Sequence, residues 1–251
     1  MAASSGGYGT HSLLNELKKL GLEGLARKAY PPMPTLNVIP EAELRAIQAE
    51  IFKPNSVILN VGSGAATGCG QRLWEGQGAE SLTLINMDIG PGGGVGLVGD
   101  AHTLPLADHS VDAVAMQAVL EHLPNPESAI AEVERVLKPG GVFYVEMPFL
   151  QGFHADPHDY QRYTLEGLRQ RLAGFDEERS GVSIGPFCTL VWIVRDGLSS
   201  CFRNRWLYAG SRFIWGWLLS PLRYLDLLVR NNPAAYRLAN EYYFLGRKSG
   251  H

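Results

Sequence analysis

Cysteine is scarce in this sequence, and no two cysteines stand at a metal-binding spacing. The 251 residues include three, Cys69, Cys188 and Cys201, and none belongs to a C-x-x-C motif. An odd number at scattered positions argues against a disulfide framework and a zinc ribbon, and it fits a reducing compartment. We interpret all three as packing residues or inert thiols.

A large excess of one charge is also lacking. The net charge is −3, so composition gives no argument for nucleic-acid binding. The first residues, MAASSGGYGTHS, lack the basic start and apolar run of a secretory signal, and we expect a loose tail there. At this length, with 45% hydrophobic residues, we expect one globular, cytoplasmic domain with an appendage.

The longest apolar stretch is too short and too interrupted to cross a membrane. It reads RFIWGWLLSPLRYLDLLV and contains Pro221, Arg223 and Asp226. We predict two helices that are broken near Ser220–Pro221. The second should carry an apolar stripe made of Leu222, Leu225, Leu228 and Val229.

The surrounding segment, residues 187–237, differs in composition from the rest of the chain. It has seven arginines, two aspartates and no lysine or glutamate, so its net charge is +5, and it holds four of the five tryptophans. Such asymmetry predicts a separate role. Three interpretations stay open: a helical cap, a lid that also lies on a membrane surface through Trp215 and Trp217, or a homodimer interface.

Elsewhere, apolar strands alternate with helical patterns. The expected strands are 56–61, 82–88, 95–100, 111–117, 142–148 and 242–248, and the expected helices are 12–28, 40–52, 125–138 and 164–175. Near-continuous apolar strands that alternate with helices predict a parallel sheet covered on both faces. We assign 1–55 to a tail and helices and 56–251 to one domain, with residues 187–237 as a helical insertion before the last strand.

A glycine-rich turn follows the first expected strand, in ILNVGSGAATG. Gly62, Gly64 and Gly68 can admit a ligand that a Cβ would block, and a helix N-terminus beyond them attracts negative groups. Asp88 ends the next strand, where a carboxylate can accept both ribose hydroxyls, and Asp100 ends the third. Together they predict one nucleoside-shaped crevice at the carboxyl edge of the sheet.

These stretches, with GDAHTLPLADHSVDAV and AVLEHLPNPESAIAEVERVLKPGGVFYVEMP, resemble the class I S-adenosylmethionine-dependent methyltransferases, and among them the type 11 small-molecule group. The resemblance covers roughly residues 56–148. It implies a Rossmann-like, doubly wound sheet of seven strands with the last strand antiparallel. It also implies S-adenosyl-L-methionine as the cofactor.

The resemblance further implies which residues meet that cofactor. Glycines 62 and 64 would border its methionine portion, Asp88 its ribose, Asp100 with Ala101 its adenine, and Gln117 the methyl group. The full expected set is Asn60, Gly62, Ser63, Gly64, Asp88, Ile89, Asp100, Ala101 and Gln117. Two positions depart from the family pattern: Asn60 replaces its usual acid, and Ala66 stands where its third glycine would fall.

A second polar cluster, GFHADPHDYQRYT at residues 152–164, follows the fifth strand. It supplies the candidate catalytic residues His154, Asp156, His158 and Tyr160. They could line the acceptor pocket and take a proton, bind a metal through H-x-D-x-H, or form a hydrogen-bonded turn. No metal ligand is assigned on the sequence alone. The nearby LEHL (120–123) resembles a structural element of the family.

The sequence thus predicts methyl transfer to a small-molecule or lipid- or glycan-linked acceptor, with oxygen as the candidate acceptor atom. Positioning supplies much of the catalysis in such a reaction, so the lack of an evident catalytic triad does not argue against an enzyme. Two alternatives stay open. One is an NAD(P)-dependent oxidoreductase, which the glycine spacing disfavours, and the other is a methyltransferase-like binding protein without activity.

Overall fold

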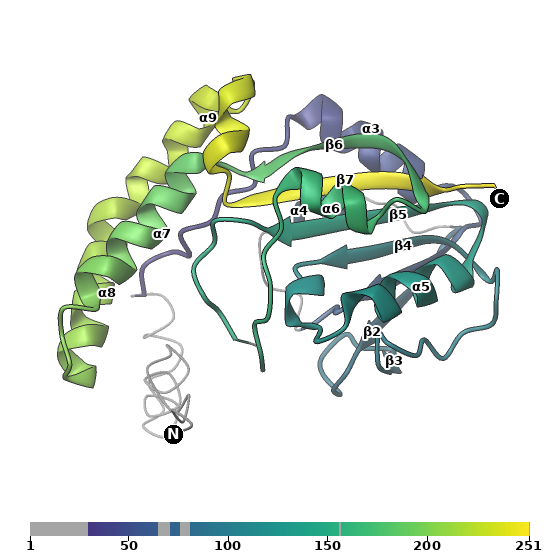
Figure 1. Cartoon of the computed structure of the whole chain (residues 1–251), viewed down its shortest axis with the longest axis horizontal. Helices are drawn as coiled ribbons and strands as arrows, with labels where there is room; N and C mark the ends of the chain where they lie inside the picture. The colour runs from purple at the N-terminus through teal and green to yellow at the C-terminus, as the bar shows by residue number, and fades with distance from the viewer. Residues whose placement is uncertain (1–29, 65–70, 76–80, 156, 251) are drawn as a thin grey trace.

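A seven-stranded sheet forms the centre of the molecule in a computed structural model, which describes residues 30–64, 71–75, 81–155 and 157–250 (Figure 1). The order of the strands is β3-β2-β1-β4-β5-β7-β6. Their bounds are β1 Val57–Val61, β2 Thr83–Asp88, β3 Leu97–Val98, β4 Val111–Gln117, β5 Leu137–Pro148, β6 Phe175–Ile184 and β7 Glu241–Lys248. The expected tail and helix within 1–29 lie outside the described residues.

The direction of the strands confirms the predicted fold class. Strands β1 to β5 pair in parallel, whereas β7 runs antiparallel to both β5 and β6. Strand β1 lies between β2 and β4, so the chain order reverses beside it. Ligands in open α/β sheets bind at the carboxyl ends of strands at such a reversal.

Helices cover both faces of the sheet because neighbouring residues of each strand point to opposite sides. On one face, Leu59 of β1 packs in a cluster with α5 (Pro126–Val136) and α6 (Leu165–Arg171). On the other face, Ile58 packs with α3 (Glu41–Ile51) and α4 (Gln71–Trp74). The two clusters fix the strands and thereby the loops at their ends.

Helix α5 begins as its sequence predicts. The side chain of Asn125 accepts a hydrogen bond from the Ser128 N–H, and Pro126 occupies the first turn. An N-cap of this kind satisfies a backbone donor that the helix leaves unpaired.

The segment between β6 and β7 folds into five consecutive helices. They are α7 Pro186–Ser199, α8 Arg205–Leu219, η2 Ser220–Leu225, α9 Asp226–Val229 and η3 Pro233–Leu238. They run along one side of the molecule, at the end of the sheet to which β4 and β5 point, and the loop after β5 hangs between them and the sheet (Figure 1). The helical character and the break after Leu219 agree with the sequence pattern.

The apolar stripe that was predicted for the helix after Ser220–Pro221 differs from the structure. Leu222 is 36% exposed and Leu228 is 80% exposed, while the buried residue of α9 is Asp226. Residues 220–225 form a 3-10 helix, which changes the angular spacing on which the stripe depended. Leu222 and Leu228 therefore face outward, whereas Leu225 and Val229 are half-buried.

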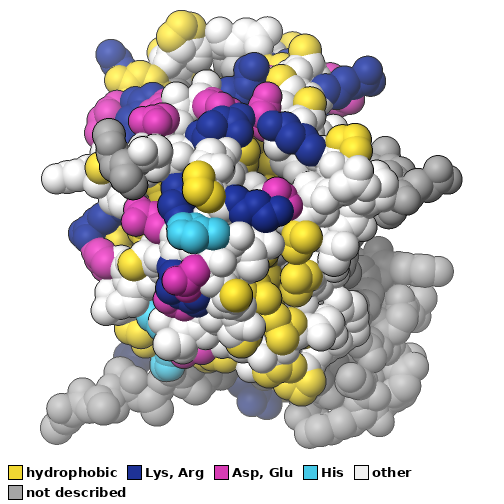
Figure 2. Space-filling view, turned by 90° about the vertical axis from the view of Figure 1, so that its right-hand side faces the viewer, with side chains coloured by type: hydrophobic (Ala, Val, Ile, Leu, Met, Phe, Trp, Pro, Cys, Tyr) yellow, Lys and Arg dark blue, Asp and Glu magenta, His cyan; other side chains and the backbone are white. Residues whose placement is uncertain are grey.

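The end of the sheet that lies opposite the insertion carries mixed charges. Figure 2 shows this face, where Lys and Arg side chains lie among Asp and Glu side chains. Near the start of β5 and the end of β7, the ion pairs include Lys138–Asp112, Arg135–Asp108 and Arg247–Glu50. Exposed pairs of this kind contribute little stability, and this face offers no excess of either sign for a charged partner.

No helix in the described part of the chain is long and apolar enough to span a membrane.

Candidate functional site

The glycine turn after β1 has a backbone that other residues would strain. Gly62 has φ +70° and Gly64 has φ +49°, in the left-handed region. A Cβ on Gly62 would stand 2.4 Å from Cγ2 of Val119, so this side of the turn has no room for a side chain. Gly68 and Ala66 lie outside the described residues.

Ser63 lies between these two glycines. Its N–H donates to the carbonyl of Met87, 3.0 Å away, which ties the turn to β2. Its hydroxyl oxygen is buried and has no hydrogen-bond partner among the described residues. A buried hydroxyl without a partner is costly, so a polar ligand group in this turn would stabilise it.

Asp88 organises the space between the glycine turn and the loop after β2. One carboxylate oxygen accepts the Gly64 N–H at 2.8 Å, and the other lies 3.4 Å from the Gly90 N–H. The side chain is half-buried, and each oxygen keeps further acceptor capacity. The carboxylate is therefore held in place and can still accept hydroxyl groups.

Asp100 lies close to that site along the sheet edge. Met87 and Asp88 of β2 pair with β3, and the Gly99 N–H donates to the Asp88 carbonyl. The Asp100 carboxylate accepts from the His102 N–H at 2.9 Å, and this bond, followed by the bond with the His102 ring, holds its pKa below the usual range. Asp100 stays ionised and exposed, and Ala101 is buried against the core.

Two other expected cofactor residues are already hydrogen-bonded within the protein. Asn60 donates from its amide to Asn86 across the β1–β2 pair at 3.0 Å. The side-chain oxygen of Gln117 accepts the indole N–H of Trp74 at 2.8 Å. Both side chains sit at strand ends beside the glycine turn, and their contacts give them a positioning role there.

Ile89 is 74% exposed directly after Asp88. If the carboxylate binds a ribose, the flat ring attached to that ribose can pack against the exposed apolar side chain beside it. Together with the orphaned Ser63 hydroxyl and the cradle at Gly62, this arrangement fits S-adenosyl-L-methionine. These residues lie at the carboxyl edge of the sheet, and their contacts with the cofactor stay predictions.

The loop after β5 is held by an ion pair. The Arg162 guanidinium donates to both oxygens of Asp159, and the second oxygen also accepts the His154 N–H at 2.8 Å. Burial alone raises the pKa of Asp159, but the hydrogen bonds from Arg162 and His154 outweigh it and lower that pKa. Of the three interpretations left open for this loop, the hydrogen-bonded turn is present, and sequence reasoning gave no part in it to Asp159 and Arg162.

The candidate catalytic residues of that loop do not all point the same way. The ring of His154 is largely buried, whereas His158 and Tyr160 are exposed, with their rings 5.5 Å apart between centroids. The Tyr160 N–H donates to the carbonyl of Glu121, which fastens the loop to the end of β4. Asp156 lies outside the described residues.

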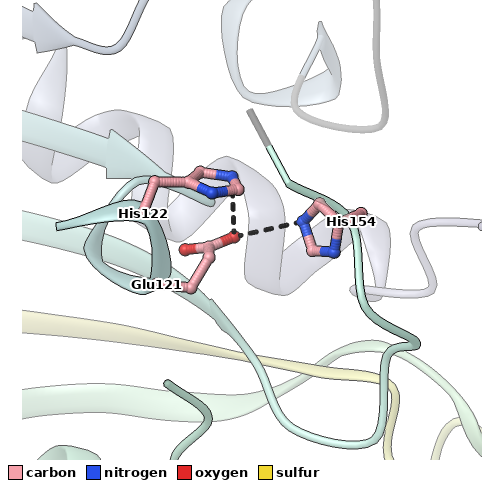
Figure 3. Close-up of side chains that lie close together, drawn as sticks. All are labelled: Glu121, His122 and His154. Atoms are coloured by element: carbon pink, nitrogen blue, oxygen red, sulfur yellow. Dashed lines mark ion pairs between the residues drawn. The ribbon is translucent and has the colours of Figure 1, made fainter. Parts of the chain in front are cut away.

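Glu121 and His122, in η1 (Leu120–His122), meet His154 at this junction (Figure 3). One oxygen of Glu121 lies 3.7 Å from Nε2 of His122 and 3.6 Å from Nε2 of His154. Burial lowers the pKa of His154, but the Glu121 carboxylate and the Gly152 carbonyl outweigh it, so that pKa is raised. The sequence placed Glu121 and His122 in a structural element and gave no sign of their contact with His154.

Two further carboxylates lie buried in the sheet nearby. Glu146 of β5 accepts a hydrogen bond from the Tyr144 hydroxyl at 2.6 Å, and Glu241 of β7 accepts one from Ser183 at 2.8 Å. Burial raises the pKa of both, and the charge of Glu146 raises that of Glu241 further. The pair therefore keeps a proton to a higher pH than exposed carboxylates do.

Comparison with known proteins connects this geometry to a family. Residues 59–145 match the type 11 family described as a methyltransferase domain. An uncharacterized chloroplastic methyltransferase of Arabidopsis thaliana is 54% identical over 122 residues, which are 46% of this chain and 30% of that protein. A ubiquinone/menaquinone biosynthesis C-methyltransferase of Acidiphilium cryptum is 28% identical, over 64% of this chain and 63% of its own length.

A solved structure shares the fold at low identity. The [4+2]-cyclase SpnF superposes with a TM-score of 0.54 at 16% identity, over 96% of this chain and 97% of its own. The chain spans 13%, 30% and 63% of the lengths of the first curated relatives that it matches. Residues 59–145 are therefore similar to the type 11 methyltransferase domain, and the likeness to the solved structure shows the fold alone.

Proposed function

We propose that this chain is an S-adenosylmethionine-dependent methyltransferase whose acceptor is a small, lipid-linked or glycan-linked molecule. The observation that carries the proposal is the carboxyl edge of the sheet. There the constrained glycine turn, the Asp88 carboxylate and the exposed Ile89 adjoin one another, within the matched family region.

The cofactor, when bound, supplies a methyl group already activated on a sulfonium. The protein then has to orient an acceptor in line with that group and exclude water. Asp88 would fix the ribose, and the Ser63 hydroxyl would meet a polar group of the cofactor. The loop after β5 would form the acceptor side of the pocket.

An oxygen acceptor needs a group that takes its proton. We assign this role to His158, because its ring is exposed on the acceptor loop and its backbone carbonyl is held by the His122 ring. Tyr160 lies beside it and would orient the acceptor. Carbon is the second candidate atom, because the Acidiphilium cryptum relative is named a C-methyltransferase.

The acceptor is proposed to be lipid-linked because of the outer face of α8. Leu207, Ile214 and Leu218 follow helical spacing and are 58%, 57% and 63% exposed. Arg203 and Arg205 are exposed at the N-terminal end of this helix, within the segment of net charge +5. Apolar side chains flanked by arginines suit an anionic membrane surface, which would bring a lipid-linked acceptor to the loop between α8 and the sheet.

Cofactor binding and turnover test the proposed activity. We expect S-adenosylmethionine and S-adenosylhomocysteine, but not NAD, to raise the melting temperature, since a ligand at 100 times its Kd stabilises the native state by about 2.7 kcal/mol. The transfer of a radiolabelled methyl group should then be measured with two acceptors, demethylmenaquinol in micelles and a small phenol. Stabilisation by NAD alone would support an oxidoreductase. Cofactor binding without transfer to either acceptor would favour a binding protein.

Membrane contact is tested separately by flotation with vesicles of phosphatidylglycerol and phosphatidylcholine. We expect the protein to float with them, and the Ile214→Ser/Leu218→Ser variant to bind about tenfold or more weakly, because two apolar side chains leave the interface. Val98→Ser is the matched control, because Val98 is 55% exposed on β3. Equal flotation of all three proteins, or flotation of none, would contradict the membrane proposal.

A further inference from the structure

Two segments far apart in the sequence bring three potential metal ligands together. Glu121 and His122 come from η1 after β4, and His154 comes from the loop after β5. One ligand atom from each lies within 4.8 Å of the others (Figure 3). The Glu121 oxygen is the common neighbour of the two Nε2 atoms, as the dashed lines show.

The outer nitrogen of each imidazole faces a backbone carbonyl. Nδ1 of His122 lies 2.5 Å from the His158 carbonyl oxygen, and Nδ1 of His154 lies 3.1 Å from that of Gly152. A carbonyl only accepts, so these two contacts favour a hydrogen on each Nδ1, and in the neutral form of such a ring the lone pair of Nε2 turns toward Glu121. Backbone carbonyls orient metal-binding histidines in this way.

The carboxylate between the rings is otherwise isolated. Glu121 is 0% exposed, and neither of its oxygens has a hydrogen-bond partner among the residues that the structure describes. A buried carboxylate without a partner is strongly destabilising. Three groups that all offer lone pairs thus converge in a place from which water is largely excluded, and a cation between them would satisfy all three.

We propose that Glu121, His122 and His154 bind a divalent first-row transition metal ion, for which Zn²⁺ is the probe. Bonds of 2.0–2.2 Å place tetrahedral ligand atoms about 3.3–3.6 Å apart. The two Nε2–Oε1 separations, 3.7 and 3.6 Å, need to close by only a few tenths of an ångström. Two imidazoles and one carboxylate form a ligand set that zinc and non-haem iron accept, whereas Ca²⁺ and Mg²⁺ prefer oxygen alone.

The competing occupant of this place is a proton. Nη2 of Arg162 lies 3.2 Å from Nδ1 of His154, and it can only donate. If Nδ1 accepts that bond, the proton of the ring moves to Nε2 and points at Glu121. The cluster would then be a histidine–carboxylate contact that leaves one acceptor fewer for a metal.

A metal with three protein ligands keeps at least one position open. Because η1 follows β4 on the same sheet edge as Gln117, an oxygen of the acceptor could fill that position. This second step rests on the proposed function, whereas metal binding does not.

The test uses the full chain after treatment with a chelator that is then removed. We expect calorimetric titration with Zn²⁺ to give one site per chain, and His122→Ala and His154→Ala each to weaken it at least tenfold. Titration with Co²⁺ should give visible bands of a nitrogen and oxygen ligand set. A near-ultraviolet thiolate band would assign the metal to cysteine and overturn the proposal.

The matched control is His158→Ala, which removes an imidazole from the same loop and keeps the backbone carbonyl that orients His122. It should bind Zn²⁺ as the parent does, and near-ultraviolet circular dichroism should show that all three variants are folded. Absence of a stoichiometric site in the parent, or equal affinity in all variants, would overturn the metal proposal. Methyl transfer by a protein without a Zn²⁺ site would overturn this inference alone and leave the proposed function standing.

Discussion

Replacing Asp88 by alanine is expected to weaken S-adenosylmethionine binding by about 100-fold. The carboxylate would lose its bonds to two ribose hydroxyls, and hydrogen bonds to a charged group contribute about 1.5–3 kcal/mol each. The variant also leaves the Gly64 N–H without the Asp88 oxygen that accepts it at 2.8 Å, so the glycine turn keeps only the Ser63–Met87 backbone bond to β2. Calorimetric titration with S-adenosylhomocysteine measures the change directly.

The Asp88→Asn variant removes the charge of this side chain and keeps its shape. It keeps one oxygen for Gly64, so we expect a loss of about tenfold, with the fold unchanged. Asp108→Ala is the matched control, since Asp108 is exposed and pairs with Arg135 at the opposite edge of the sheet. Affinities for S-adenosylhomocysteine that agree between Asp88→Ala and Asp108→Ala would place the ribose elsewhere.

The sequence alone predicted that Gly62 and Asp88 lie at the same edge of the sheet, because this arrangement depends only on the order of the strands along the chain. Gly62 and Asp88 each follow a strand of a parallel sheet, and the carboxyl ends of such strands meet at one edge. The cap at Asn125 was readable for a similar reason, since its partner lies three residues away. Local patterns predict local contacts well.

The junction of Glu121, His122 and His154 was not predictable in this way. Glu121 and His154 are 33 positions apart in the numbering, and the path of the loop after β5 depends on Arg162 and Asp159. Nothing in LEHL or in GFHADPH shows that one faces the other. Only the tertiary structure shows that the carboxylate is buried and that both imidazoles turn toward it.

The capping role of Asp226 was not evident from the sequence for a related reason. In the sequence it counts as a charge that rules out a membrane span. In the structure it is 0% exposed, and its two oxygens accept the N–H groups of Phe187 and Cys188 at 2.8 Å each. Helix α7 begins after Gly185, which has no side chain to cap it, so a residue from α9 does so across the insertion.

Asp226→Ala is therefore expected to lower the free energy of unfolding of the insertion by about 3 kcal/mol. Two buried N–H groups lose a charged acceptor, and the positive end of the helix dipole loses its counter-charge. Urea unfolding followed by tryptophan fluorescence reports on the change, because four of the five tryptophans lie within residues 187–237.

A second variant tests whether capping is the cause. Asp226→Asn keeps one acceptor and should lose about half as much stability. Equal stability of Asp226→Ala and the parent protein would refute the capping role. The expected order, with alanine at 226 less stable than asparagine and asparagine less stable than the parent, would show that a buried charge fastens α9 to α7.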